Sequence, residues 1–330
     1  MRKGRFLGCV MGMSFLLFTN AAWGVDLVGH RGARGLAPEN TLPSFARALS
    51  LGVTVLELDT AITKDSVIVV SHDPILNPNI TRDKYGKWLE KPGPAIHSLT
   101  FTELQQYDVG RLKPNTKYAN SFPEQKALDG TRIPRLVDLF SLVKKSGNEQ
   151  VRFFIELKVS PHKPEETLDP ETYAKRVIDL IHKEGMAARA SILSFDWRTL
   201  QVVQKIAPEI PTIYLSVQQR AFDNIAAEKP EGSLWTAGFQ HKDHGSVPRM
   251  VKAAGGKIWS PYFGDLTEAQ LKEAHDLGLQ VGVWTVNEPG DIKKMLDVGV
   301  DGITSDRPDL LRQIMAERGM KLPVATPVQP

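Results

Sequence analysis

Short apolar runs alternate with amphipathic stretches along most of the chain. A short apolar run bounded by turn-forming residues is typical of a buried strand. Apolar residues at every third or fourth position are instead typical of a helix that packs through one face. The pattern predicts eight strands, with the ranges 26–30, 53–63, 151–159, 190–195, 211–217, 257–263, 279–287 and 301–306.

Amphipathic stretches with the helical period lie between these strands, at 42–52, 136–147, 172–185, 196–208, 267–278 and 291–300. Several end on a glycine, such as Gly52 and Gly278, where a left-handed C-cap costs least. Short helix-to-strand links with right-handed crossovers build a parallel sheet, and eight such units predict a closed (β/α)8 TIM barrel. A doubly wound open sheet is the alternative, and the segment 234–239 has no place in the count.

One region, residues 74–134, breaks this alternation because it is dense in Pro, Asn, Gly and charged residues. A compact domain rarely contains so long a loop, so we interpret the region as an insertion with little regular structure. It contains one predicted helix within 99–108, where Thr100 can cap the helix and Glu103 can complete a capping box. An insertion that follows a barrel strand is expected to lie over the active-site mouth. The last residues, 321–330, are predicted to form a flexible tail.

The amino terminus has the pattern of a secretory signal peptide. Arg2, Lys3 and Arg5 precede an apolar run over 6–18, and small residues follow it. We predict a signal peptide at residues 1–24 with cleavage after Gly24, which leaves a barrel domain at 25–320. The alternative is a membrane anchor, but the run is shorter than the ~20 residues that a span needs. We therefore expect a periplasmic or secreted protein without a stable membrane anchor.

Composition narrows the range of partners and metals. Cys9, the only cysteine, lies within the predicted signal, so the mature chain offers no disulfide and no zinc-thiolate site. The formal net charge of +3 equals the three basic residues of the signal, which contains no Asp or Glu, so the mature chain is formally neutral. A nucleic-acid partner attracted by bulk charge is therefore not expected.

Carboxylates in two predicted strands indicate a metal site. Glu57 and Asp59 are two residues apart and therefore face the same way from an otherwise apolar strand. Glu156 and Lys158 repeat this spacing in the next predicted strand. The alternative for Glu57 and Asp59 is a solvent-facing edge of the strand, and the alternative for Glu156 and Lys158 is an internal ion pair. Hard oxygen ligands favour one divalent cation, Mg²⁺ or Ca²⁺, over zinc.

Two of the eight histidines, His30 and His72, end apolar runs near these carboxylates. Imidazoles can accept and donate a proton near neutral pH, and Arg31 and Lys158 add positive charge for an anionic substrate. A metal, two acid/base candidates and two cations together favour hydrolysis or transfer at a phosphate ester. A glycosidase is less favoured because a neutral sugar would leave the cations without a role. The chain contains neither a P-loop nor a G-x-S-x-G motif, which disfavours a nucleotide triphosphatase and a serine hydrolase.

Five motifs, in order along the chain, resemble those of the glycerophosphodiester phosphodiesterase family. They are "GHRGARGLAPENTLPSFARAL", "LELDTAITKDSVIVVSHDP", "FFIELK", "VWTVN" and "GVDGITSDRPD". The signal and the insertion after "HDP" resemble the periplasmic branch of that family. The motif "DGITSD" departs from the usual pattern of two apolar residues before Thr-Asp, which leaves Ser305 without a role.

The resemblance implies a TIM barrel with a small inserted domain and an activity on glycerophosphodiesters. Glycerophosphocholine or glycerophosphoethanolamine would be hydrolysed to sn-glycerol 3-phosphate and an alcohol, as part of the metabolism of glycerol and phospholipid breakdown products. The matching positions would be His30 and His72 as the general acid/base pair, Glu57, Asp59 and Glu156 as metal ligands, Arg31 and Lys158 as phosphate contacts, and Phe195 and Trp284 beside the glycerol. Phe195 and Trp284 would serve equally well as barrel core.

Two rival functions remain open at this stage. One is a phospholipase-D-like enzyme of the same barrel type that acts on lysolipid or sphingomyelin. Such relatives typically have a disulfide-stabilised loop, which the mature chain lacks the cysteines to form. The other is a non-catalytic binding protein for glycerophosphodiesters. This alternative is disfavoured because all the motif positions are filled. Headgroup preference and oligomeric state are left open.

Overall fold

The structure of the protein is a computed structural model, and it describes residues 24–330. The predicted signal peptide, apart from Gly24, lies outside these residues. Eight parallel strands make up a barrel in the described part of the chain: β1 (Asp26–Gly29), β2 (Val55–Ile62), β4 (Arg152–Leu157), β5 (Ala190–Ser194), β6 (Thr212–Ser216), β9 (Ile258–Pro261), β10 (Gln280–Val283) and β11 (Gly302–Ser305). All eight coincide with predicted strands.

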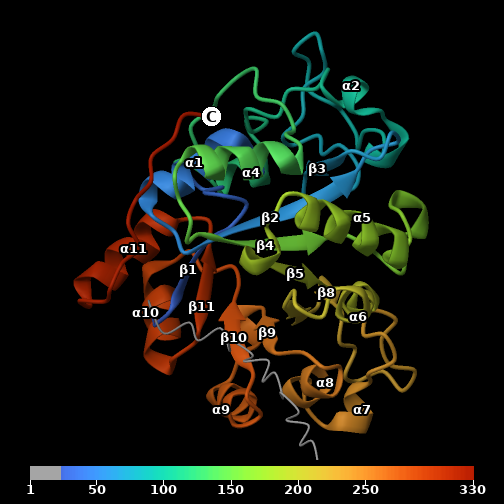
Figure 1. Ribbon diagram of the computed structural model, residues 1–330, viewed down its shortest axis with the longest axis vertical. Coiled ribbons are helices and arrows are strands. Elements are labelled where there is room, and N and C mark those ends of the chain that lie inside the picture. The colour runs from blue at the N-terminus through green and yellow to red at the C-terminus, as the bar shows by residue number, and fades with distance from the viewer. Residues whose placement is uncertain (1–23) are drawn as a thin grey trace, which may run out of the picture.

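The barrel closes because β1 pairs with two neighbours, β2 on one side and β11 on the other (Figure 1). A short strand, β3 (Ile68–Val70), extends this sheet by pairing antiparallel to β2, and it was not predicted. A small hairpin outside the barrel consists of β7 (Gln218–Gln219) and β8 (Phe222–Asp223). The closed parallel sheet confirms the predicted (β/α)8 fold and excludes the open doubly wound sheet.

Helices surround the barrel, and their bounds are α1 (Leu42–Leu51), α2 (Phe101–Leu104), α3 (Lys117–Asn120), α4 (Leu136–Lys145), α5 (Pro170–Lys183), α6 (Trp197–Ile206), α7 (His241–His244), α8 (Val247–Ala253), α9 (Glu268–Asp276), α10 (Pro289–Val298) and α11 (Pro308–Glu317). Single 3₁₀ turns are η1 (Ile96–Ser98), η2 (Pro164–Glu166), η3 (Ala187–Arg189) and η4 (Phe263–Asp265). The six predicted helices are present. The residues of α3, α7, α8 and α11 were not predicted to be helical, and the segment 234–239 forms turns before α7.

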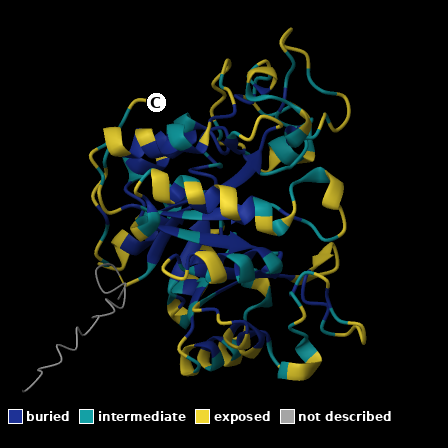
Figure 2. Cartoon of the chain, turned by 45° about the vertical axis from the view of Figure 1, so that its right-hand side comes forward, coloured by how far each residue is buried: buried dark blue, intermediate teal, exposed yellow. Residues whose placement is uncertain are grey.

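The longer helices each bury one face against the barrel and leave the other in solvent, so yellow and dark blue alternate along them in Figure 2. The short helices α3 and α7 have no buried residue. Phe140 of α4 and Phe153 of β4 pack edge to face with ring centroids 5.0 Å apart. Local signals agree with this packing. Thr41 caps α1 by accepting a hydrogen bond from the Ser44 amide, and Gly52 ends α1 with φ 70°.

The insertion between β3 and α4 has few regular elements but its own small core. Leu76, Ile96 and Leu104 are buried in a cluster with Val69 of β3. The predicted helix is present as α2, and its capping box forms because the side chain of Thr100 accepts from the Glu103 amide. Figure 1 shows this region beyond the carboxyl end of β2.

The carboxyl-terminal segment lacks regular secondary structure, as predicted, but it is docked on the barrel. The Thr326 amide donates to the Leu49 carbonyl over 2.9 Å, and the side-chain amide of Asn148 donates to the Thr326 hydroxyl over 3.0 Å. These hydrogen bonds attach the segment to the barrel, and the flexibility of residues 321–330 stays a prediction. Among residues 24–330 no helix is long and apolar enough to cross a membrane.

Candidate active site

The loop that joins β1 to α1, residues 30–41, packs tightly between α1 and the end of β11. A Cβ atom at Gly32, where φ is 87°, would lie 2.6 Å from the Ser44 hydroxyl. A Cβ atom at Gly35 would lie 2.7 Å from the Asp306 carbonyl oxygen. Only glycine fits such approaches. The loop therefore holds His30 and Arg31 at the carboxyl ends of the barrel strands, where TIM-barrel active sites lie.

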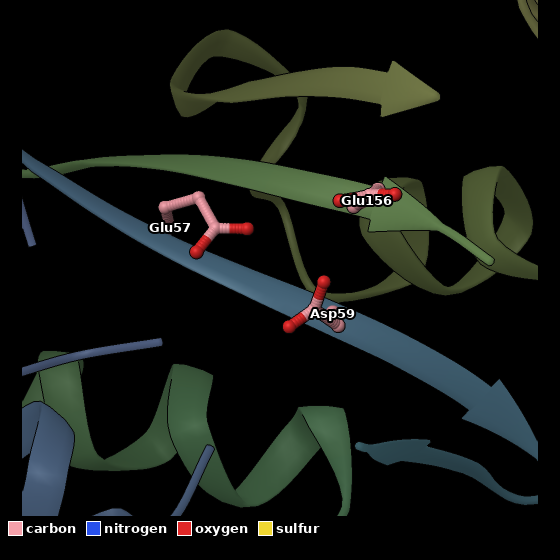
Figure 3. Close-up of side chains that lie close together, drawn as sticks. All are labelled: Glu57, Asp59 and Glu156. Carbon is pink, nitrogen blue, oxygen red and sulfur yellow. The ribbon is translucent and has the colours of Figure 1, made fainter. Parts of the chain in front are cut away.

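Three carboxylates from neighbouring strands meet at this end of the barrel. Glu57 and Asp59 extend from β2 and Glu156 from β4, and Asp59 is directly opposite Glu156 in the strand register. One oxygen from each of the three lies within 4.8 Å of the others, and all three residues are buried (Figure 3). The sequence prediction that these acids converge is confirmed.

Two cations border this acidic triad. The Lys158 ammonium lies 3.0 Å from Asp59 Oδ1 and 2.8 Å from Glu156 Oε1. Arg31 donates its backbone N–H to Glu57 Oε2 over 2.8 Å, and its Nε lies 3.3 Å from Asp59 Oδ2 without forming a hydrogen bond. Asn40 donates to Asp59 Oδ2 over 2.8 Å. The predicted phosphate contacts, Arg31 and Lys158, thus lie beside the predicted metal ligands.

The pKa values of two acids of the triad are shifted in opposite directions. Burial, followed by the charges of Asp59 and Glu156, raises the pKa of Glu57 well above its usual value. Burial also opposes ionisation of Asp59, but Lys158 and then His72 hold the pKa of Asp59 well below its usual value. The unequal environments of the two acids thus separate their pKa values.

The donor set fits a divalent cation. All three candidate ligands are carboxylates, and their oxygens are close enough to share one ion. Hard oxygen ligands of this kind select Mg²⁺ or Ca²⁺ rather than soft metals. A cation would also relieve the repulsion that raises the pKa of Glu57. Glu57, Asp59 and Glu156 are therefore the residues that could hold the metal.

The imidazole of His30 is partly buried and is held by a network of polar groups. Its Nδ1 lies 2.7 Å from Asp306 Oδ1, and its Nε2 lies 3.9 Å from Glu57 Oε2. Asp306 in turn accepts hydrogen bonds from Arg34 over 2.7 Å and from the side-chain amide of Asn287 over 2.8 Å. Burial, followed by the charge of Arg34, lowers the pKa of His30 to about 4. The other ring nitrogen, Nε2, faces the acidic triad.

The imidazole of His72 is oriented in the same way by a simpler arrangement. Its Nδ1 lies 2.8 Å from Asp73 Oδ1, and Asn77 donates to Asp73 Oδ2 over 2.7 Å. Burial, followed by the charge of Arg31, lowers the pKa of His72. A carboxylate at Nδ1 leaves Nε2 available for proton transfer, and the two predicted acid/base residues both border the same cavity.

An aromatic wall borders the opposite side of the cavity. The rings of Phe195 and Trp284 are edge to face with centroids 5.3 Å apart, and the Lys158 ammonium lies 5.8 Å from the centroid of Phe195. Trp284 donates its indole N–H to the Ser260 carbonyl over 3.0 Å. The structure therefore places both predicted aromatic residues at the site, next to a predicted phosphate contact.

Several residues of the site were missed by the sequence analysis. Asp306, Asp73 and Asn287 position the histidines, and the motif "SD" that had left Ser305 without a role contains Asp306 itself. Ser305 has a local task, because its hydroxyl accepts from the Arg307 amide over 3.0 Å at the start of α11. The sequence did contain a signal for two of these residues. Asp73 directly follows His72 in "SHD", and Asp306 ends the strand motif "TSD".

Tyr118, in helix α3 of the insertion, was also missed. Its hydroxyl donates to Glu39 Oε2, and Glu39 Oε1 accepts from Arg31 over 2.7 Å. The Arg34 guanidinium lies 4.6 Å from the ring centroid of Phe122, one turn further along. The insertion thus helps to orient the arginines of the first barrel loop, a contact between segments that no local pattern reveals.

Comparison with known families gives a consistent result. A sequence model described as the glycerophosphoryl diester phosphodiesterase family matches residues 30–310. A glycerophosphodiester phosphodiesterase from Caldanaerobacter subterraneus is 26% identical over 293 residues, which cover 89% of this chain and 98% of that protein. The human enzyme named lysophospholipase D GDPD1 is 25% identical over 301 residues, covering 87% and 85%.

Solved structures show the same fold. A proposed glycerophosphoryl diester phosphodiesterase from Silicibacter pomeroyi is 37% identical, with a TM-score of 0.81 over 91% of this chain and 96% of that chain. A phosphodiesterase from Oleispira antarctica, solved with its product sn-glycerol-3-phosphate, is 20% identical, with a TM-score of 0.61 over 88% and 96%. At that lower identity the second likeness concerns the barrel alone.

Proposed function

The chain belongs to the glycerophosphoryl diester phosphodiesterase family and is an enzyme of that type, and we propose that it hydrolyses glycerophosphodiesters with a bound divalent metal and two acid/base histidines. Glycerophosphocholine and glycerophosphoethanolamine are the proposed substrates, and sn-glycerol 3-phosphate and the headgroup alcohol are the products. One observation carries the proposal. Three buried carboxylates lie within 4.8 Å of one another beside Lys158, Arg31, His30 and His72.

The charged residues of the site suit a phosphodiester anion. The Lys158 ammonium and the Arg31 guanidinium can each donate to phosphate oxygens, and the planar fork of Arg31 is suited to two of them. Both are already fixed by carboxylates, so little reorganisation is needed when the substrate binds. A cation held by Glu57, Asp59 and Glu156 would supply charge neutralisation of the phosphate and a lower pKa for an attacking hydroxyl.

The two histidines would move the protons. One imidazole Nε2 accepts the proton of the attacking hydroxyl, and the other donates a proton to the oxygen of the departing alcohol. Asp306 and Asp73 hold the two rings so that these nitrogens face the substrate. The attacking hydroxyl is either water or the 2-hydroxyl of the substrate's glycerol, and the second route forms a cyclic phosphate before hydrolysis.

We also propose that the protein acts in the periplasm or outside the cell, as a member of the periplasmic branch. The basic residues, the apolar run and the small residues of 1–24 support this proposal. Cell fractionation and mass spectrometry of the mature amino terminus test it. A mature chain that starts near Val25 is expected, and a cytoplasmic protein that retains residues 1–24 would contradict it.

The activity is tested with purified protein and glycerophosphocholine, with and without EDTA. We expect release of sn-glycerol 3-phosphate and choline, loss of both in EDTA, and recovery on addition of Mg²⁺ or Ca²⁺. Turnover that persists in EDTA would remove the metal from the mechanism. Binding of glycerophosphocholine without any turnover would support the non-catalytic alternative. Rates across several headgroups then establish the preferred substrate.

A further inference from the structure

A row of aromatic rings leads away from the acidic triad. Its first ring is Phe195, directly after β5, and the Lys158 ammonium lies 5.8 Å from the centroid of that ring. Phe222 of β8 packs edge to face against Phe195 with centroids 5.2 Å apart. Trp235 lies 5.2 Å beyond Phe222, and the ring of His162 ends the row 5.8 Å from Trp235. The row thus connects the proposed phosphate contact Lys158 with the rim of the active site.

Two rings of this row, Phe222 and Trp235, lie outside the cavity that Phe195 and Trp284 border. We define Phe222 and Trp235 as the outer aromatic pair. The side chain of Phe222 is 36% exposed, and that of Trp235 is partly exposed. Large apolar groups that stay exposed beside an active site commonly mark a surface that binds a ligand. The outer aromatic pair is therefore available to a part of the substrate that extends out of the cavity.

The segment that carries the outer aromatic pair is fixed to the end of β5. Asn224 is fully buried, and its side-chain amide donates to the Phe195 carbonyl over 3.3 Å. The Ser233 hydroxyl donates to the Asn224 carbonyl over 2.6 Å, and the Trp197 amide donates to the Trp235 carbonyl over 2.8 Å. The two rings are thus positioned before any substrate binds, which lowers the entropy cost of binding.

The charges around the β7–β8 hairpin favour a cation. Asp223, which directly follows Phe222, accepts from the Ile225 amide over 2.9 Å. Asp265 lies against the hairpin and accepts from the Gln218 amide over 2.7 Å. Within residues 24–330 neither carboxylate forms an ion pair. The hairpin segment 218–223 contains one basic residue, at position 220, so two carboxylates and one guanidinium leave a net negative charge there.

From this arrangement we infer that the outer aromatic pair binds the quaternary ammonium of a choline headgroup and makes the enzyme select glycerophosphocholine over glycerophosphoethanolamine. Aromatic faces attract cations, indole most strongly, and rings of this kind are a recurrent site for quaternary ammonium groups. An ethylene spacer joins the ammonium to the phosphate, so a phosphate beside Lys158 brings the cation to the aromatic row.

The ethanolamine headgroup suits this surface less well. Its primary ammonium is compact and strongly hydrated, as that of a lysine side chain is, and it carries three hydrogen-bond donors. Aromatic rings replace those lost hydrogen bonds poorly, whereas a trimethylammonium group has no donor to satisfy. The inference rests on the proposed phosphodiesterase activity and adds the headgroup preference of the same site.

Three diesters with the same glycerophosphate test the inference on the wild-type enzyme. They are glycerophosphocholine, glycerophosphoethanolamine and the neutral dimethylbutyl analogue of glycerophosphocholine, in which a carbon atom replaces the nitrogen. The kcat/KM for glycerophosphocholine should exceed each of the others roughly five- to thirtyfold. Equal values for glycerophosphocholine and the neutral analogue would overturn recognition of the charge, and equal values for the two natural diesters would overturn the preference. If none of the three is hydrolysed, the proposed function fails instead.

Substitutions of the outer aromatic pair link the preference to these rings. Phe222→Leu and Trp235→Leu should each lower the kcat/KM ratio of glycerophosphocholine to its neutral analogue roughly threefold or more, and Trp235→Phe should lower it less. Leu234→Ala is the matched control, because Leu234 lies in the same loop, is 64% exposed and has no ring. Thermal unfolding shows which variants are folded. An unchanged ratio in folded Trp235→Leu would contradict the inference, and if that variant does not fold, Trp235→Phe and the wild-type series decide.

Discussion

The two candidate acid/base residues, His30 and His72, are oriented in the same way but by networks of very different depth. The side chain of His30 is 12% exposed and that of its carboxylate partner, Asp306, 3%. The corresponding values for His72 and Asp73 are 32% and 30%. Asp306 is held by two further side chains, whereas Asp73 accepts one further hydrogen bond, from Asn77.

The two histidines therefore differ in how far their orientation depends on the barrel fold. The network of His30 joins β1, the first barrel loop and the end of β11, so it is part of the closure of the barrel. The network of His72 lies within a few residues of sequence at the start of the insertion. We therefore expect both histidines to be equally necessary for turnover. Substitution of their carboxylate partners, Asp306 and Asp73, is expected to lower kcat by unequal factors.

Removal of either histidine should have the largest effect on activity. His30→Ala and His72→Ala each lose a proton-transfer group, so kcat should fall roughly 100- to 10,000-fold with the fold intact. Steady-state rates with glycerophosphocholine and thermal unfolding measure the two outcomes. Wild-type turnover in either variant would remove that histidine from the acid/base pair and make the comparison meaningless.

The carboxylate partners test the comparison itself. Asp306→Asn should lower kcat roughly 100-fold, because the amide favours the wrong imidazole tautomer in a buried site. Asp73→Asn should cost only about tenfold, because solvent can reach that ring. Arg34→Gln is the control for Asp306→Asn, since it removes the ion pair but keeps the carboxylate at His30. Equal losses in the two Asn variants, or the reverse order, would contradict the inequality.

Glu57 tests whether the environment of His30 includes the metal. Glu57 Oε2 lies 3.9 Å from His30 Nε2, so the acid borders both the metal site and the histidine. Glu57→Gln should weaken binding of Mg²⁺ or Ca²⁺ about tenfold or more while the fold is retained. Isothermal titration calorimetry measures this directly, and an unchanged titration would exclude Glu57 as a ligand.

The smallest expected effect concerns the insertion. Tyr118→Phe removes the hydrogen bond to Glu39, which in turn holds Arg31. The loss of one such bond should raise KM roughly three- to tenfold with little change in kcat. Tyr85→Phe is the matched control, because Tyr85 lies in the same insertion and its side chain is exposed. Equal KM values in both variants would show that the insertion does not act through Arg31.

The barrel and its acidic triad could be predicted because both depend on local patterns. Apolar runs mark strands, and the spacing of Glu57 and Asp59 on one strand places both on one face. The same holds for the helix that begins after Thr100, since its capping box is a local signal. Residues of this kind carry their structural meaning within a few neighbours.

Contacts between distant segments could not be predicted in this way. Asp306 is 276 positions from His30, and Tyr118 is 79 positions from Glu39, so nothing local pairs them. Helix α11 is different. Its buried Leu311, Ile314 and Met315 follow the helical period, so the pattern was present but not used.

The most direct test of the account is a crystal structure with Mg²⁺ or Ca²⁺ and sn-glycerol 3-phosphate bound. We predict one cation held by Glu57, Asp59 and Glu156, with the phosphate in contact with Lys158 and with the Nε2 atoms of both histidines facing it. A cation bound elsewhere, or a phosphate beyond the reach of both histidines, would contradict the proposed site and its mechanism.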